Sequence, residues 1–431
     1  MKARHIYFSG IGGAGLSPLA LIAKQAGYEV SGSDKQDSDY IHNLRSKGIE
    51  DIHVGQTTDA IAALHTRHPI DWVVYSSAVP KENPHHPELL FAQEHSIQHS
   101  KRDEFLNELL EYTGQKMIAV AGTHGKTTTT AMLIWLCKQL NIPASHSVGG
   151  KLSFSGIGTF NPEAQYFIYE ADEYDRNFLS FHPLMSVIAG IGYDHPDIYP
   201  TKETYYEAFR QFITQSERTV LWHADAERIN LKPSENITEL DDATMLDDIM
   251  LPGRVNRINA HIAIVALEKL GLCSYTQGVE VMNQFPGVSR RFEKLADNIY
   301  TDYAHTPEKI AGALQLTKEI AGPNVVVVYE GLHNTRQHFI KEELRTLFAG
   351  IKKLYVVPSY LAREDTSLEL LTPEILCESI IQEPADRVPS QLDDELFNAI
   401  QTHARSGDLV LCISAGGGNS LDEWLRQRLQ A

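Results

Sequence analysis

The chain has 431 residues, of which 42% are hydrophobic, and its formal net charge is −18. This length predicts two to four domains with ample core. The acidic balance argues against nucleic acid as a partner, because phosphate backbones bind basic surfaces. Four scattered cysteines without a C-x-x-C pair are typical of reduced thiols in the cytoplasm. We find no leader segment and no apolar run long enough to span a bilayer, so we expect no membrane insertion.

The first segment, residues 1–110, has the pattern of a Rossmann-like domain. An apolar strand at 5–9 leads into Gly-Ile-Gly-Gly-Ala-Gly, which has the spacing G-x-G-x-x-G, and a helical pattern follows. A second strand then delivers Asp34. We expect a diphosphate at the helix N-terminus and Asp34 near a ribose. Taken alone, the motif suggests NAD; a glycine turn without a ligand is the simpler alternative.

The second segment, residues 111–285, carries a phosphate-binding loop. A strand at 117–120 precedes Ala-Gly-Thr-His-Gly-Lys-Thr-Thr-Thr-Thr, and an apolar helix follows. Such a turn aims backbone N–H groups at an anion, Lys126 would reach the terminal phosphates, and Thr127 would hold Mg²⁺. Val120 stands where the Walker A pattern needs its first glycine, so a surface turn is the alternative. Because Lys126 follows a glycine turn, we expect it to support no core.

Acidic side chains follow the next strands of this segment. Glu170 ends one apolar strand and His195 follows another. Ligands of α/β sheets gather at the carboxyl ends of strands, so we expect both residues beside an Mg²⁺–nucleotide. At least one of Asp172, Glu173 and Asp175 is expected to lie in a solvated acidic turn.

The third segment, residues 286–431, has the pattern of a second Rossmann-like unit. Strands are predicted at 299–301, 325–329, 354–357 and 409–413, with helical stretches between them. Their ends carry Asp-Tyr-Ala-His, Asn-Thr-Arg and a glycine cluster. The glycine cluster suits either an anion-binding turn or a flexible loop.

Together these motifs resemble the Mur ligase family, the ATP-dependent amino-acid ligases of peptidoglycan synthesis, over the whole chain and in the right order. Gly-Thr-His-Gly-Lys-Thr and Arg-Arg-Phe are marks of the alanine-adding branch and of its near relative, which adds a recycled murein tripeptide. The other motifs that carry the resemblance are GIGGAGLS at 10–17, GSD at 32–34, SSA at 76–78, EADE at 170–173, DH at 194–195 and DYAH at 302–305.

The resemblance implies an α/β protein with three domains. These are an N-terminal Rossmann-like domain for a UDP-sugar (1–110), a central P-loop ATPase domain (111–285) and a C-terminal Rossmann-like domain for the amino acid (286–431). It further implies a cytoplasmic monomer or homodimer that needs ATP and Mg²⁺. Its reaction would join L-alanine to the lactyl carboxylate of UDP-N-acetylmuramate through an acyl phosphate. This step serves cell-wall biogenesis, and through it cell shape and division.

The resemblance also assigns roles to individual residues. The residues implied to bind the UDP-sugar are Gly12, Gly13, Ala14, Gly15, Ser33, Asp34, Ser76, Ser77 and Ala78. Those implied to bind ATP are Gly122, Thr123, His124, Gly125, Lys126, Thr127, Thr128, Asn259, Arg291, Asp302 and His305. Thr127, Glu170 and His195 would hold the metal, and Lys126, Glu170 and His195 would be catalytic. Tyr303, His333 and Arg336 would face the amino acid, with Arg336 on its carboxylate.

Several positions depart from the alanine-adding pattern. Gly190 stands where an asparagine is usual, and Thr306 replaces a histidine. In the acceptor loop, Glu330 and Asn334 resemble the tripeptide branch, and His333 replaces an arginine. The tripeptide ligase is therefore one alternative. An NAD-dependent oxidoreductase and a non-catalytic UDP-sugar-binding paralogue are the others.

Overall fold

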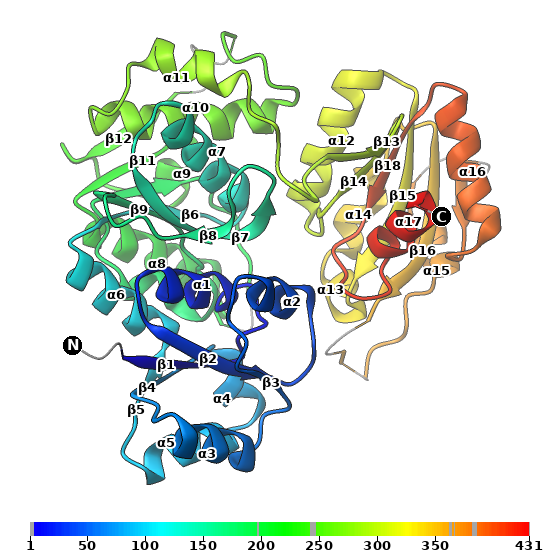
Figure 1. The fold of residues 1–431 in the computed structure, drawn as a ribbon. Coiled ribbons are helices and arrows are strands. Elements are labelled where there is room, and N and C mark those ends of the chain that lie inside the picture. The colour runs from blue at the N-terminus through cyan, green and yellow to red at the C-terminus, as the bar shows by residue number, and fades with distance from the viewer. Residues whose placement is uncertain are drawn as a thin grey trace. The chain divides into compact units, whose positions relative to one another are not determined.

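A computed structural model describes residues 4–195, 198–241, 247–361, 364–365, 367–381 and 386–430. The chain forms two compact units. The first, called unit 1, comprises Met1–Ile249 and Asn259–Phe285, and the second, unit 2, comprises Met250–Ile258 and Pro286–Ala431. Within the described residues, no helix is both long and apolar enough to cross a membrane. The three predicted α/β parts of the chain are present, and each contains its own sheet (Figure 1).

The first sheet of unit 1 is parallel, with strand order β3-β2-β1-β4-β5. All five residues of β1 are buried, which explains its apolar sequence at the centre of a two-faced sheet. Its strands are β1 His5–Ser9, β2 Glu29–Asp34, β3 Ile52–Val54, β4 Trp72–Tyr75 and β5 Gln98–Lys101. Its helices are α1 Ser17–Gln25, α2 Asp39–Ser46, α3 Thr58–Arg67, α4 Ala78–Glu82, α5 Pro87–Glu94 and α6 Arg102–Thr113.

The second sheet of unit 1 has the order β12-β11-β10-β6-β9-β7-β8 and is parallel except for the edge strand β8. Its strands are β6 Lys116–Ala121, β7 Ala144–Leu152, β8 Gly156–Thr159, β9 Tyr166–Glu170, β10 Met185–Ile188, β11 Arg218–Trp222 and β12 Ile237–Leu240. Its helices are α7 Lys126–Gln139, the 3₁₀ segment η1 Tyr174–Ser180, α8 Lys202–Gln215, α9 His223–Arg228, α10 Arg254–Lys269 and α11 Tyr275–Met282.

The two sheets of unit 1 share one hydrophobic core. Helix α1 lies between the first sheet and the β7–β8 hairpin (Figure 1), and Gly158 in β8 approaches the backbone of Pro18 so closely that a Cβ there would lie 3.0 Å from the Pro18 carbonyl oxygen. Buried residues of both sheets and their helices, among them Ile6 in β1, Ala119 in β6 and Phe209 in α8, form a single cluster. The carboxyl ends of β1 and β6, which carry the two glycine loops, therefore belong to one packed body.

The sheet of unit 2 has the order β13-β14-β18-β15-β16-β17 and is parallel except for the edge strand β13. Its strands are β13 Glu293–Ala296, β14 Ile299–Asp302, β15 Val325–Leu332, β16 Lys353–Tyr360, β17 Arg387–Pro389 and β18 Leu409–Ile413. Its helices are α12 Pro307–Ala321, α13 Asn334–Phe339, α14 Lys341–Leu347, α15 Pro373–Ser379, α16 Asp394–Arg405 and α17 Leu421–Gln430. Core clusters cover both faces of this sheet, as a doubly wound layer requires.

Candidate functional site

The predicted phosphate loop has the expected strand–turn–helix form. It joins β6 to α7, and Gly125 occupies the N-cap of the helix with φ 76°. Gly122 has φ 141°, and a Cβ on it would lie 2.8 Å from the Gly190 carbonyl oxygen. Only glycine suits such a position. The turn and the N-terminus of α7 therefore form a cradle for an anion.

Lys126 pairs with a buried carboxylate, so the prediction that it supports no core is wrong. Its Nζ donates to Glu173 Oε2 at 2.7 Å and to the Gly122 carbonyl oxygen at 2.5 Å. Glu173 is only 1% exposed, although the sequence places it in an acidic turn. Burial alone would raise the pKa of Glu173, but the Lys126 ammonium and His195 lower it to about 2. Glu173 thus remains charged because Lys126 is there.

The acidic turn is solvated only in part. Asp172 is 40% exposed, as expected, whereas Asp175 is 19% exposed and pairs with Lys81 and Lys101. The sequence offered one signal for the buried position of Glu173: it lies three residues beyond Glu170, just past a strand that ends at the phosphate loop.

His195 lies beside Glu173 rather than beside Glu170. Its Nε2 is 3.6 Å from Glu173 Oε1 and 3.9 Å from Asp194. Burial would lower the pKa of His195, but its contact with Glu173 and the charge of Asp194 raise it. The backbone of His195 is left-handed, with φ 57°, as are those of Asp175 and Arg176. Such backbone costs a non-glycine residue about 1–3 kcal/mol, so this part of the site is strained.

The predicted metal residues form two neighbouring groups. Thr127 Oγ1 donates to Glu170 Oε1 at 2.8 Å, and the other Glu170 oxygen accepts from the Gly149 N–H at 2.7 Å. His195 pairs with Glu173 instead. In the described part of the chain, no three His, Cys, Asp or Glu side chains are close enough to hold a metal ion. The oxygen donors of Thr127 and Glu170 nevertheless suit Mg²⁺, which usually takes few protein ligands and fills its shell with phosphate and water.

Thr123 and His124 contact residues that lie beside the phosphate loop. Thr123 Oγ1 donates to the Gly192 carbonyl at 2.5 Å and lies 2.7 Å from the Tyr205 hydroxyl. The His124 ring fills the space beside Gly190, where a Cβ would overlap Cε1 of the ring. Gly190 stands where the resembling family usually has an asparagine, and its lack of a side chain makes room for the His124 ring.

Two further predicted nucleotide residues lie on α7 and α10. Thr128 is in the first turn of α7. Asn259 is 2% exposed, and its Oδ1 would be 2.7 Å from a Cβ on Gly125. Asn259 therefore lies against the phosphate loop, and its role toward ATP stays a prediction.

The glycine loop after β1 gathers most of the predicted sugar-nucleotide residues. Gly12 N donates to Asp34 Oδ2 at 2.9 Å, so Asp34 supports the loop in addition to any role toward a ribose. Ser76 Oγ would lie 3.3 Å from a Cβ on Gly10. Gly13 and Ala14 continue the turn, and Gly15 ends it just before α1.

Two of the predicted serines are used inside the fold. Ser33 is completely buried, and its Oγ accepts from Gln56. Ser77 Oγ donates to Asn177 at 3.2 Å, and Ala78 begins α4. The side chains of Ser33 and Ser77 therefore hydrogen-bond to other residues of the protein, Gln56 and Asn177.

In unit 2, the predicted residues after β14 lie close together. The Arg291 guanidinium is 4.9 Å from the Tyr303 ring, whose centre is 5.4 Å from that of His305. Asp302 Oδ2 accepts from the Phe292 N–H at 2.8 Å. Loss of solvent raises the pKa of Asp302 to about 6 and lowers that of His305 well below its usual value.

The predicted acceptor-loop residues have different partners within unit 2. Arg336, in α13, is near enough to His305 for its charge to lower the pKa of that histidine further. His333 Nδ1 is 3.5 Å from Glu364. Both Glu330 oxygens are engaged within the fold, one by Ser414 Oγ at 2.6 Å and the other by the Leu421 N–H at 2.9 Å.

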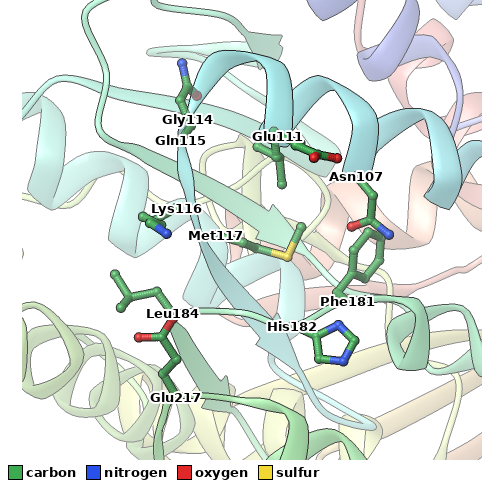
Figure 2. A pocket seen from close by; sticks show the side chains of 11 residues that line it. Asn107, Glu111, Gly114, Gln115, Lys116, Met117, Phe181, His182, Leu184 and Glu217 are labelled. Atoms are coloured by element: carbon green, nitrogen blue, oxygen red, sulfur yellow. The ribbon is translucent and has the colours of Figure 1, made fainter.

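A cavity of about 400 Å³ lies at the opposite, amino end of β6 (Figure 2). Asn107, Lys116, Met117, His182 and Glu217 are among its lining residues, and the predicted site residues are not. A second cavity, of about 460 Å³, lies in unit 2 beside Glu330 and Tyr360. The two glycine loops, at the carboxyl ends of β1 and β6, therefore lie outside the cavity of Figure 2.

The fold and site of unit 1 define a nucleotide-binding α/β protein of the P-loop type. Family models match in chain order: "Mur ligase family, catalytic domain" at residues 5–113, "Mur ligase middle domain" at 120–240 and "Mur ligase, glutamate ligase domain" at 290–416. The chain therefore belongs to the Mur ligase family, as the motifs predict.

Similar proteins cover the whole chain. A UDP-N-acetylmuramate–L-alanine ligase of Symbiobacterium thermophilum is 31% identical, over 100% of this chain and 96% of the relative. One of a Nocardioides species is 32% identical, over 95% and 93%. The crystal structure of the UDP-N-acetylmuramate–alanine ligase of Thermotoga maritima has a TM-score of 0.75 at 24% identity, covering 99% of this chain and 98% of that one. A murein peptide ligase of Psychrobacter arcticus has a TM-score of 0.64 at 24% identity and the same coverage. The three-domain Mur ligase fold is thereby confirmed.

Proposed function

We propose that this chain uses ATP to join L-alanine to the lactyl carboxylate of UDP-N-acetylmuramate, a step of peptidoglycan precursor synthesis. The chain is an amide-bond-forming ligase by family. The observation that carries the proposal is a lysine at the phosphate loop, paired with a buried carboxylate, in the same packed unit as a second glycine loop. Relatives of about 30% identity that are named for L-alanine supply the acceptor.

The residues of unit 1 suit phosphoryl transfer from ATP to a carboxylate. The lactyl carboxylate attacks the γ-phosphorus, ADP leaves, and an acyl phosphate remains. Lys126 would offset the charge that develops on the transferred phosphoryl group, while Glu173 holds the ammonium in place. The cradle of Gly122 to Thr128 would bind the other phosphates. Thr127 and Glu170 would hold Mg²⁺ from one side and His195, which pairs with Glu173, from the neighbouring group; the chemistry of the ion is to neutralise phosphate charge.

In the second step the amine of alanine attacks the acyl carbon, and phosphate leaves. We assign Arg336 to the carboxylate of alanine, because a guanidinium matches a carboxylate with two parallel hydrogen bonds. Tyr303 and His333 would line the same site. Arg291, Asp302 and His305 are assigned to the nucleotide. Since ATP and UDP-sugars are cytoplasmic metabolites, we place the activity in the cytoplasm. As a separate expectation from the family resemblance, we propose a monomer or homodimer.

The test is ADP release by the purified chain with UDP-N-acetylmuramate and ATP, with and without L-alanine. We expect release only when all three substrates and Mg²⁺ are present. Lys126→Met should lower turnover by about 100-fold or more. Lys116→Met is the matched control and should be active, because Lys116 lies at the exposed amino end of β6, the strand that precedes the phosphate loop. Calorimetry with NADH should show no binding.

The murein tripeptide is the acceptor that the assay must exclude. Glu330 is one of the residues that resemble the tripeptide branch, and its carboxyl group is hydrogen-bonded inside unit 2. We therefore expect L-alanine to be preferred. Faster ADP release with L-Ala-γ-D-Glu-diaminopimelate would mean that the acceptor is the tripeptide, and no release with any acceptor would indicate a binding paralogue.

A further inference from the structure

Arg102 touches the glycine loop of the first sheet from the side of the phosphate loop. It is the first residue of α6, directly after β5, and its side chain is 12% exposed. A Cβ on Gly15 would overlap Arg102 Nη1. The guanidinium therefore takes the space that any larger residue at position 15 would need.

The other side of the same guanidinium faces the acidic turn after β9. Arg102 Nη2 donates to Asp172 Oδ2 at 3.3 Å, a long distance for a charged pair. Asp172 is 40% exposed and directly precedes Glu173, the partner of Lys126. Arg102 thus lies between the loop for the sugar nucleotide and the residues around the γ-phosphate.

The hydrogen-bonding capacity of Arg102 is not used up by the protein. Its Nε is buried and has no hydrogen-bond partner among the described residues, although Asp103 Oδ1 lies 3.5 Å away. Burial raises the pKa of Asp103 to about 6 despite that neighbour. The Nε atom is enclosed by the protein, but Nη2 is held only by a long bond to a partly exposed carboxylate, and another anion can take the place of that carboxylate.

Nearby charges point to the same class of ligand. Lys81 and Lys101 face the acidic turn from the carboxyl edge of the first sheet and pair with Asp175 at 2.9 Å and 3.1 Å. With Arg102 they form a cluster of three cations that three aspartates face, Asp175 beside the two lysines and Asp103 and Asp172 beside Arg102. The cluster lies where a sugar nucleotide would pass from the glycine loop toward ATP.

We propose that Arg102 binds an anionic group of the sugar-nucleotide substrate, taking it in exchange for Asp172. The inference rests on the proposed function, and it adds a binding residue that no motif contains. The ligand group is an anion whose oxygens would bind the planar guanidinium of Arg102. It comes either from the diphosphate at Gly15 or from the lactyl carboxylate that must reach Lys126.

Calorimetry with two ligands distinguishes these sources. UDP-N-acetylmuramate carries both groups, whereas UDP-N-acetylglucosamine has the same diphosphate and lacks the lactyl carboxylate. Arg102→Gln should weaken UDP-N-acetylmuramate binding by about 10- to 100-fold. An equal loss with both ligands assigns Arg102 to the diphosphate; a loss with UDP-N-acetylmuramate alone assigns it to the carboxylate.

The controls separate binding from folding. Arg45→Gln removes an arginine from α2 of the same sheet and should bind both ligands as the wild type does. ATP affinity should be unchanged in Arg102→Gln. If that variant unfolds, Arg102→Lys, which keeps a cation beside Asp103, must still bind more weakly. Wild-type affinity in a folded Arg102 variant overturns the proposal, whereas a wild-type chain that binds neither ligand overturns the proposed function itself.

Discussion

Replacing Lys126 by methionine should destabilise unit 1 as well as stop turnover. An ordinary glutamate has a pKa near 4.5, and that of Glu173 is about 2. The difference corresponds to about 3 kcal/mol of interaction that favours the charged carboxylate. Glu173 is 1% exposed, so solvent screens little of this energy. Because Lys126 is the main stabilising partner, Lys126→Met should cost unit 1 about 3 kcal/mol at pH 7.

A double-mutant cycle with Glu173→Gln measures this energy. Amide hydrogen exchange in β6 and β10 reports the opening free energy of the unit that holds the site. In the Glu173→Gln background, Lys126→Met should cost much less, because no buried charge is left unpaired. Lys116→Met should change stability by at most about 0.5 kcal/mol. An equal cost of Lys126→Met in both backgrounds would refute the assigned pairing.

The pH dependence has a definite sign. The pKa of Glu173 is lowered on folding, so its contribution to stability is present above the unfolded value near 4.5 and is lost as pH falls toward 2. The deficit of Lys126→Met should therefore be smaller at pH 3 than at pH 7.

Three other substitutions test other parts of the site. Gly190→Ala should cost about 1–3 kcal/mol, because the new Cβ overlaps His124, and unchanged thermal unfolding would contradict this. Glu170→Gln should raise the Mg²⁺ concentration for half-maximal turnover by about 10-fold or more, and a titration curve like that of the wild type would remove Glu170 from the metal site. Burial raises the pKa of Glu330 to about 7, so stability is lost as pH rises through that value. Glu330→Gln should therefore stabilise unit 2 by at most about 3 kcal/mol at pH 8 and hardly at all at pH 4, as urea unfolding at both pH values would reveal.

The sequence predicts the strands that carry the site because each is a short apolar run bounded by glycine or acidic residues. Strands β1, β6, β9 and β10 all lie where the pattern places them. The hairpin strand β8 was not predicted, because the weakly apolar sequence Gly-Ile-Gly-Thr lacks the alternation of a typical edge strand. The local pattern identifies these buried strands, but it misses β7 and β11, which also lie inside the second sheet.

The burial of charged residues could not be predicted in the same way. Glu173 belongs to an acidic run, and whether such a residue is solvated depends on a cation elsewhere in the chain, here Lys126. Arg102 belongs to no motif, and its contact with Gly15 exists only because β5 and β1 end on the same edge of the first sheet. Both residues are defined by partners that are distant in sequence.

The left-handed backbone at Asp175, Arg176 and His195 has a consequence for engineering this chain. Glycine at any of these positions would relieve strain of about 1–3 kcal/mol. A screen for heat resistance would therefore find improved variants at the site itself. Asp175 anchors two lysines and His195 contacts Glu173, so such variants would relieve backbone strain while losing ion pairs of the site. Thermostable forms should instead be sought at the amino ends of the strands, away from both glycine loops.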